Sequence, residues 1–362
     1  VGAGVTVNTI DSTVQMNVSD SELQAAQNVA LTAVETRNIQ QTATNVAAGG
    51  AAIGANIAIT TVGKKITDSD VLAEIDRANN ALVNEDTQEN NASALLNGAG
   101  DALKTAGIEE SSVTPSIGAE YGGGKDSQIT VNISNSNVTG SAIKAEAAEH
   151  DVIDMTLGSG SAGGVAINAG VGILDVNRNV GVHITGGSMT ADTIDVNTDI
   201  TGAANLEVYQ GSAGVVSGNA AVGQVSTSGS STISIDNARF TSNVMNVLAA
   251  DHGVTNVNVL GVTVGAVSVG AIVAGAENTG NTEVEMQNSK IEDKDGDNNG
   301  TVSIKTDKAN TVTAHAMGGA GGALAAQGVV ATASDEGESR ITLQAGNALA
   351  AKEIAIAAKA SP

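Results

Sequence analysis

The chain lacks cysteine and tryptophan, holds 2 prolines, and draws only 1% of its 362 residues from the aromatic types. Without cysteine it has no disulfide framework and no thiolate metal site. Aromatic side chains supply much of the buried area in ordinary globular cores, so a core here has to be built from small and β-branched residues. Few aromatics together with 44 glycines also suit a disordered chain, but a disordered chain has no reason to keep the register described below.

Basic residues are scarce as well: 16 lysines and arginines stand against 39 acidic residues, and the net charge is −23. Nucleic acids and anionic membrane surfaces require lysine- and arginine-rich patches, so we expect neither as a partner. No apolar run approaches the ~18–20 residues that span a bilayer, so we expect no membrane insertion. The chain starts at Val1 with no methionine and no recognisable signal peptide, and we interpret it as part of a longer protein.

A short pattern returns every 51 residues. It consists of an apolar, a polar and an apolar residue, with another apolar residue five positions later. The regular copies are Val131–Ile133, Val182–Ile184, Ile233–Ile235 and Val284–Met286, followed by Val138, Met189, Phe240 and Ile291. Two outlying copies are Met16–Val18 with Leu23 and Ile341–Leu343 with Ala348. Self-similarity at a fixed period indicates a solenoid.

The alternation inside each copy predicts a strand with one buried face. Because the same face is buried every time and the spacing is too long for hairpins, we expect the strands to stack in parallel, one coil above the next. The chain is therefore predicted to be all-β, a single parallel β-helix (β-solenoid) domain over residues 1–362 with a ~51-residue repeat. One repeat accommodates either two coils of ~25 residues or three of ~17, and the sequence leaves both open.

Residues 64–125 interrupt the repeat. Val71, Ile75, Ala78 and Leu82 follow helical spacing, and a second apolar set follows, so we predict a helical hairpin that projects from the solenoid. Loops that interrupt a repeat scaffold often carry function, which makes its polar tip the predicted partner-binding element. The alternative is that the hairpin pads one face of the solenoid. The tip residues are Asn84, Glu85, Asp86, Gln88, Glu89 and Asn90.

An acidic loop forms a second, shorter interruption. Asp293, Asp295, Asp297 and Asn299 place oxygen ligands at alternate positions, which suits a calcium ion. The loop departs from an EF-hand, because its sixth position is Asn298 and its twelfth is not an acid. Calcium binding and a solvated loop are the two alternatives here, and we expect no other cofactor.

The residue types of the chain give little support for a catalytic site. The histidines are expected at surface or turn positions on coils too far apart to converge; they are His150, His183, His252 and His315. Parallel β-helix enzymes that cleave acidic polysaccharides need clustered carboxylates and, usually, aromatic sugar platforms. The only aromatics are Tyr121, Tyr209 and Phe240, and Phe240 takes an inward position of the repeat. A polysaccharide lyase or hydrolase remains the alternative function, and we expect no enzyme.

The stretches Gly2–Ile10 and Ala52–Ile59 resemble repeats of large bacterial surface proteins, the filamentous-haemagglutinin-like and leukotoxin-type filamentous adhesins. The resemblance covers about residues 1–62 and 127–362. It implies a right-handed β-helix, export to the extracellular space or bacterial cell surface, and a role in adhesion. The Asn-Pro motifs of a two-partner secretion domain are absent, because the only prolines are Pro115 and Pro362.

We therefore expect a non-catalytic stalk or adhesive segment of a large secreted or surface-exposed bacterial adhesin. Its expected partners are neighbouring repeats of the parent protein and a host-cell surface or matrix component, contacted through the insertion. A calcium-binding passenger module is the further alternative. Because the coil ends are open strand edges, we also expect the chain to associate end to end.

Overall fold

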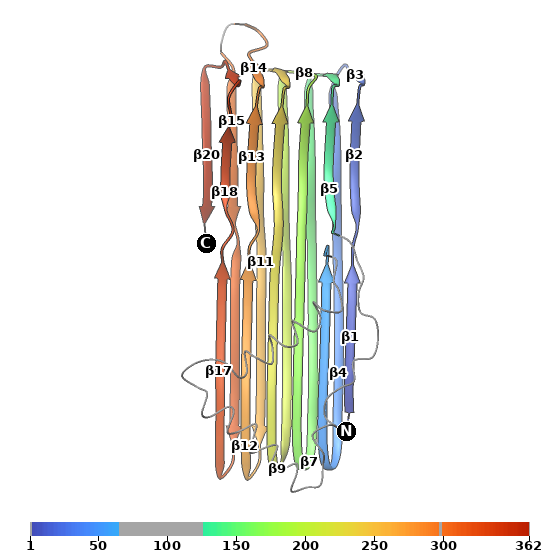
Figure 1. Ribbon diagram of the computed structural model, residues 1–362, viewed down its shortest axis with the longest axis vertical. Helices are drawn as coiled ribbons and strands as arrows, with labels where there is room; N and C mark the ends of the chain where they lie inside the picture. Colours follow the sequence, from blue (N-terminus) through green and yellow to red (C-terminus); the bar gives the residue numbers. More distant parts are fainter. Residues whose placement is uncertain (1, 65–125, 297–298, 362) are drawn as a thin grey trace.

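A computed structural model describes residues 2–64, 126–296 and 299–361 (Figure 1). Within those ranges the chain forms strands and no helix, and the strands pair in parallel. This agrees with the predicted all-β parallel class. Apart from Lys64, the predicted helical insertion lies outside the described residues.

Three very long strands set the architecture: β4 (Asn28–Val62), β7 (Ala142–Thr185) and β9 (Thr193–Asp236). Each runs down the molecule, turns back at its lower end and returns (Figure 1). In β7 the first run is residues 142–163 and the second is residues 165–185. First runs hydrogen-bond to first runs and second runs to second runs. The result is a two-layered slab whose core lies between the layers.

Shorter strands complete both layers. The first layer adds β11 (Val244–Val264), β15 (Thr301–Ala309), β16 (Thr311–Gly321) and β20 (Glu353–Ser361). The second layer adds β1 (Gly2–Ile10), β2 (Thr13–Ser19), β5 (Gln128–Ser134), β12 (Val267–Asn278), β13 (Asn281–Gln287), β17 (Leu324–Asp335) and β18 (Ser339–Leu343).

A separate sheet of very short strands closes the upper end of the slab (Figure 1). It consists of β3 (Glu22–Gln24), β6 (Asn137–Thr139), β8 (Ser188–Thr190), β10 (Arg239–Thr241), β14 (Lys290–Glu292) and β19 (Ala348–Leu349). Its central residues form one inward column that includes Val138, Met189 and Phe240. Phe240 is fully buried there, as its place in the repeat predicts. In the last coil Ile291 pairs with Leu349 and not with the expected Ala348, because the preceding turn holds one more residue.

The register shows how much chain makes one coil. Ala142 pairs with Thr193 and Thr193 with Val244, and residues paired in this way lie 51 positions apart. One passage down and one passage back fill that interval, so it holds a single coil. The expectation of two or three coils is wrong, because the glycine- and alanine-rich segments continue the long runs and do not form strands of separate short coils.

The two interruptions fall where the sequence places them. In the two long layers, paired residues that have the acidic loop between them lie 57 positions apart, as Thr282 and Ser339 do. The longer interruption falls between Val62, which pairs with Val176, and Ile129, which pairs with Val180. Both sit between strands, so the sheets continue undisturbed on either side of them.

Side chains alternate inward and outward along each run, as a pleated strand requires. The inward apolar residues form two separate clusters. The upper cluster includes Ile143, Val182 and Met245, and the lower one includes Met155, Leu174 and Leu206. Between the two clusters the inward positions are polar, charged or glycine, so the core is interrupted at mid-height.

A turn with left-handed backbone follows the upper end of each second run. Asn135 (φ 48), Asn237 (φ 53) and Asn288 (φ 49) occupy it in three coils, and Gly186 (φ 67) does so in another. Asparagine and glycine are the residues that tolerate this conformation at least cost. A Cβ on Gly186 would lie 2.6 Å from the side-chain oxygen of Asn135 in the neighbouring coil. Glycine at this position therefore leaves room for the asparagine side chain.

Candidate functional site

A belt of inward-facing polar side chains crosses the middle of the slab. It is the densest group of buried polar and charged side chains among the described residues. We call it the polar belt. Its charged members are buried or nearly so, and the first and second layers both contribute. The belt comprises Glu35, Arg37, Glu149, Asp151, Arg178, Asp251, Asn278, Lys308, Asn310 and Asp335.

The best-formed contact of the polar belt joins the two layers within one coil. Arg178, on the second run of β7, donates from Nε to Oδ2 of Asp151 on the first run at 3.0 Å. Its Nη2 lies 2.8 Å from Oδ1 of the same carboxylate. A bidentate pair of this kind is both stronger and more directional than a single ionic contact. It therefore fixes the height of one layer against the other.

Neighbouring coils add further pairs. Arg37 contacts Glu149 in the next coil, and its Nε lies 3.5 Å from Glu35. Burial is the main cause of a lowered pKa for Arg37. Lys308, in the belt's last coil, pairs with Asp335 across the layers. Buried ion pairs thus lie toward both ends of the polar belt.

Among the described residues, Asp251 is hydrogen-bonded by a neutral amide side chain and not by a cation. Asn310 donates from Nδ2 to Oδ2 of Asp251 at 3.0 Å, and its own Oδ1 accepts from the backbone N–H of Gly253 at 2.6 Å. Burial raises the pKa of the Asp251 carboxyl, and the hydrogen bond from Asn310 and the charges of Arg178, Lys308 and His252 oppose the shift. Asp251 and Asn310 lie inside the slab, where they are 4% and 3% exposed.

Sequence reasoning missed the polar belt, although the chain carried a signal for it. Glu149, Asp151 and Arg178 stand at positions whose neighbours two residues away are core residues. Alternation counted separately along the first and the second run of β7 would have placed them inside. Glycines opposite them make room: a Cβ on Gly202 would lie 1.8 Å from Oδ1 of Asp151.

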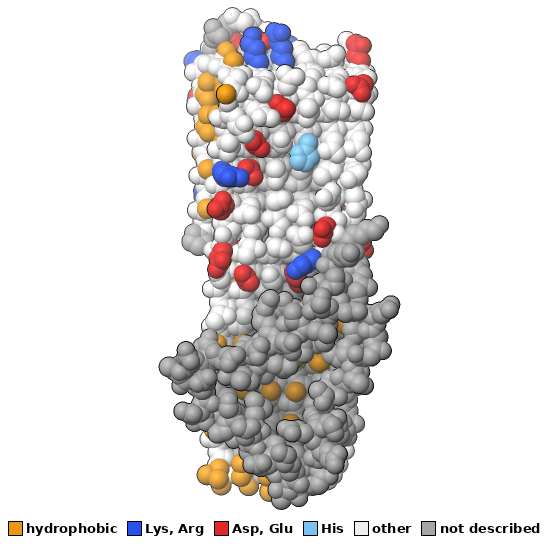
Figure 2. Space-filling model, in the orientation of Figure 1, with side chains coloured by type: hydrophobic (Ala, Val, Ile, Leu, Met, Phe, Trp, Pro, Cys, Tyr) orange, Lys and Arg blue, Asp and Glu red, His pale blue; other side chains and the backbone are white. Residues whose placement is uncertain are grey.

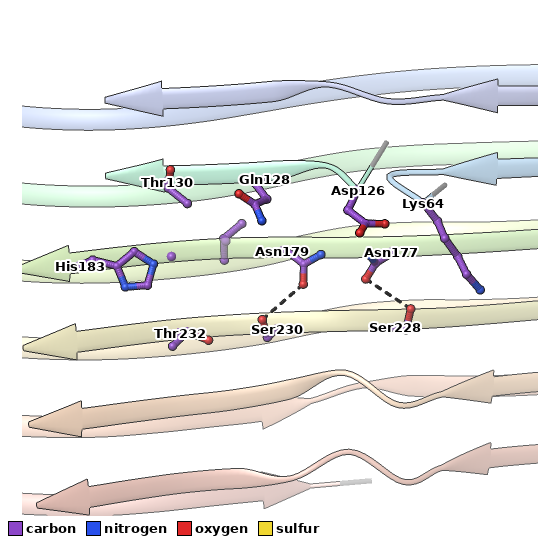
Figure 3. A pocket seen from close by; sticks show the side chains of 12 residues that line it. Lys64, Asp126, Gln128, Thr130, Asn177, Asn179, His183, Ser228, Ser230 and Thr232 are labelled. Atoms are coloured by element: carbon purple, nitrogen blue, oxygen red, sulfur yellow. Dashed lines mark hydrogen bonds between the residues drawn. The ribbon is translucent and has the colours of Figure 1, made fainter. Parts of the chain in front are cut away.

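A shallow pocket of about 440 Å³ lies on the outer face of the second layer, at the height of the polar belt (Figure 3). Asn177 accepts a hydrogen bond from Ser228 at 3.4 Å, and Asn179 accepts one from Ser230 at 3.3 Å. Burial lowers the pKa of His183 and favours its neutral form. Amides, hydroxyls and one imidazole suit hydrogen bonding to neutral polar groups. The lining is Lys64, Asp126, Gln128, Thr130, Asn177, Asn179, Val180, Gly181, His183, Ser228, Ser230 and Thr232.

The histidines lie as the repeat predicts. His150 pairs with Thr201, which pairs with His252, so the two histidines are two coils apart in one outward column. His183 sits between the buried Val182 and Ile184 and is itself outward. His315 pairs with Asn258 on the outer face of the first layer. The structure does not bring these four side chains together.

The acidic loop is described only in part, because Asp297 lies outside the described residues. Oδ2 of Asp293 accepts from the backbone N–H of Asn299 at 3.0 Å, and Oδ2 of Asp295 accepts from Asn243 at 3.0 Å. Among the residues that the structure describes, no group of three or more histidine, aspartate or glutamate side chains is placed to hold a metal ion. The structure thus does not assemble the calcium site from Asp293 and Asp295 alone.

The predicted tip residues, from Asn84 to Asn90, lie outside the described residues, as does Tyr121. Tyr209 is 39% exposed on the outer face of the first layer. No helix in the described ranges is long and apolar enough to cross a membrane. No family model, no curated protein and no solved structure matches this chain.

Proposed function

We propose that this chain is a non-catalytic structural segment of a large secreted or surface-exposed bacterial adhesin of the filamentous type, in which stacked coils carry and space adhesive elements. The observation that carries the proposal is the open edge at each end of the coil stack. In the last coil Ile354 and Ile356 take core positions beside Val302 and Ile304, yet they are 44% and 46% exposed. Edges of this kind are templates for further strand pairing.

The finer architecture belongs to the same proposal. The coils form a right-handed β-helix whose ~51-residue repeat is one coil, since parallel crossovers are right-handed in nearly all proteins. Residues 1–362 form one domain interrupted by a helical hairpin at residues 64–125. A left-handed crossover in a crystal structure would reject this part of the proposal.

The outer surface supports an extracellular, soluble scaffold. On the face shown in Figure 2, acidic side chains are spread over the upper half, and lysine and arginine lie at its upper end and singly among the acidic side chains. With a net charge of −23, separate molecules repel one another except where apolar edges meet. Neighbouring coils of the parent protein are the proposed partners of those edges.

Edge pairing can be tested by sedimentation velocity over a range of protein concentrations. We expect the chain to form end-to-end oligomers, and we expect Ile354→Lys/Ile356→Lys to remain monomeric. Ala357→Lys on the same strand is the matched control, because residue 357 points outward beside Lys305 and should leave association unchanged. A chain that is monomeric at every concentration, with strand-rich circular dichroism, would reject edge pairing.

Adhesion is tested separately, with cultured host cells and purified matrix proteins. Deletion of residues 68–115 should abolish binding if the insertion tip, Asn84–Asn90, contacts the receptor. Binding that is equal with and without the deletion would place recognition on the coils. Absence of binding from both folded proteins would reject adhesion by this segment.

Calcium at the acidic loop is a further part of the proposal, with Asp293, Asp295, Asp297 and Asn299 as its ligands. Calorimetric titration with calcium chloride should then give saturable heat that Asp293→Ala/Asp295→Ala removes. A titration without binding heat would leave the loop as a solvated insertion.

A further inference from the structure

The two outer faces of the slab differ below the polar belt. On the first layer the outward residues are mostly polar, as expected of a face in water; they include Asp154, Thr156, Asn205, Glu207, Asn256 and Asn258. On the second layer the uppermost outward rows hold Asp175, Ser226, Glu277 and Gln224, and the outward residues below them are mostly apolar. We call these residues the outer apolar face: Val7, Ile53, Ala55, Ile57, Ile59, Val165, Ile167, Ala169, Val171, Ile173, Val216, Ala220, Val222, Val267, Val269, Ala271 and Val273.

These side chains do not belong to the core between the layers. Inward positions of the same strands, such as Ala58 and Leu174, belong to the lower core cluster. Ile57, Ile59 and Ile173 form a separate cluster, against which Val7 and Val171 pack. Strands of a parallel sheet that are buried on both faces consist of nearly continuous apolar residues. The second runs of β4 and β7 have that composition.

Burial across the outer apolar face is graded. Ile59 is 1%, Ile173 3% and Val222 3% exposed, although all three side chains point away from the core. Farther along the stack the outward residues emerge, with Val267 at 38% and Leu324 at 68%. Protection is therefore greatest on β4 and on the upper rows of the face, and least in the lowest row of the C-terminal coils, which holds Val267 and Leu324.

The insertion starts and ends at the upper border of this face. Gly63 donates its backbone N–H to Ile10 at 2.7 Å, and Ser127 donates to Gly63 at 3.0 Å, so the two stems lie side by side. Between them the sequence runs through residues 65–125, with Val71, Ile75, Ala78 and Leu82 at helical spacing. A segment with one apolar side, tied at both ends to the edge of an apolar face, has a short path to cover it.

We propose that residues 65–125 pack their apolar side against the outer apolar face and so form a third layer of the molecule. No residue of the outer apolar face is charged, and Asp175 on the row above it is already paired with Lys64, so the face favours an apolar cover over a partner bound through ionic contacts. A second copy of the chain would have to compete with a segment that is already tethered at the site. The polar stretch at residues 84–91 is then left facing solvent.

The absence of cysteine allows a direct test on the full chain, because a single introduced thiol is the only one present. Ile173→Cys places it on the outer apolar face, and Thr156→Cys places it on the outer face of the first layer in the same coil. Reaction of each thiol with a water-soluble disulfide reagent is then timed. Val71→Asp/Ile75→Asp, added to each variant, disturbs the apolar side of the insertion without touching a coil.

We expect the thiol at position 173 to react about tenfold or more slowly than the one at position 156, since it is reached only by local opening. The two aspartates should raise its rate by a similar factor and leave position 156 unchanged. Equal rates at position 173 with and without the aspartates would overturn the proposal. Protection that disappears on dilution would also overturn it, because a second copy would then be the cover. Circular dichroism identifies any variant that fails to fold, and deletion of residues 68–115 provides a second way to expose position 173.

Discussion

Arg178 and Asp151 meet inside the slab with two nitrogen–oxygen contacts of 2.8 and 3.0 Å, although they lie on opposite layers of the same coil. Both side chains are almost completely buried, at 4% and 0% exposure. Removing one partner of such a pair leaves an uncompensated buried charge. The contact therefore holds the layers in register and makes the coil sensitive to any change at either residue.

We predict that Arg178→Met lowers the free energy of unfolding by about 3–5 kcal/mol, because Asp151 loses its counter-charge. Urea unfolding followed by circular dichroism measures this. Adding Asp151→Leu should recover much of the loss, because the charge left behind is removed as well. The surface pair is the control: Arg340→Ala removes a 2.6 Å contact to Glu283 at 59% exposure and should change stability by less than about 1 kcal/mol. Equal effects of the two arginine substitutions would contradict the prediction.

Two glycines of β9 should respond in opposite ways to alanine. A Cβ on Gly202 would lie 1.8 Å from Oδ1 of Asp151, whereas a Cβ on Gly211 meets nothing within 4 Å. Gly202→Ala is expected to cost about 1–3 kcal/mol through overpacking. Gly211→Ala should be neutral or stabilise by up to about 1 kcal/mol, because it restricts the unfolded chain. Thermal or urea unfolding of the two variants side by side checks the difference in sign.

The left-handed turn position predicts a ranking at Asn237. With φ at 53, Asn237→Ala should lose about 1 kcal/mol of stability. Asn237→Gly should lose less, since Gly186 fills the same position one coil earlier with φ at 67. If the alanine variant proved as stable as the glycine variant, backbone conformation would not be what selects the residue there.

Asp251 should give stability a pH dependence of unusual sign for a carboxylate. Its folded-state pKa is raised by burial, so its ionised form is disfavoured in the folded chain. Its contribution to stability is greatest below the unfolded pKa of about 3.9 and is lost as pH rises through the folded pKa. Asp251→Asn lacks this loss, so its urea midpoint relative to the parent chain should rise between about pH 4 and pH 7. A difference that stays constant with pH would contradict this. The same comparison in a His252→Gln background is the control, because His252 is one of the groups that act on the Asp251 carboxyl.

Much of the coil stack was predictable because the repeat marks residues that pair. Val131 pairs with Val182, Val182 with Ile233, and Ile233 with Val284. The sequence pattern aligned these residues in the same way. Phe240 as a core residue and the separation of His150 from His252 followed from the same alignment.

Two features, the number of coils per repeat and the polar belt, were not predicted from the sequence, and each has its own physical reason. The number of coils per repeat was hidden because glycine and alanine both break and continue strands, and only the positions of the U-turns, near Gly163 in β7, distinguish the cases. The polar belt was hidden because charged residues are assigned to the surface by default. Alternation along the first run of β7 shows that Glu149 and Asp151 point inward.

The length of each run decides how the protein grows. Neighbouring coils of a parallel sheet are about 4.8 Å apart, so each additional coil lengthens the stack by only that distance, although it consumes 51 residues of chain. The same number of residues in one α-helix would reach about 76 Å. Each repeat therefore adds little length to the stack, while the long runs within it make the two faces wide. A stack built in this way extends slowly along its axis but presents two wide walls.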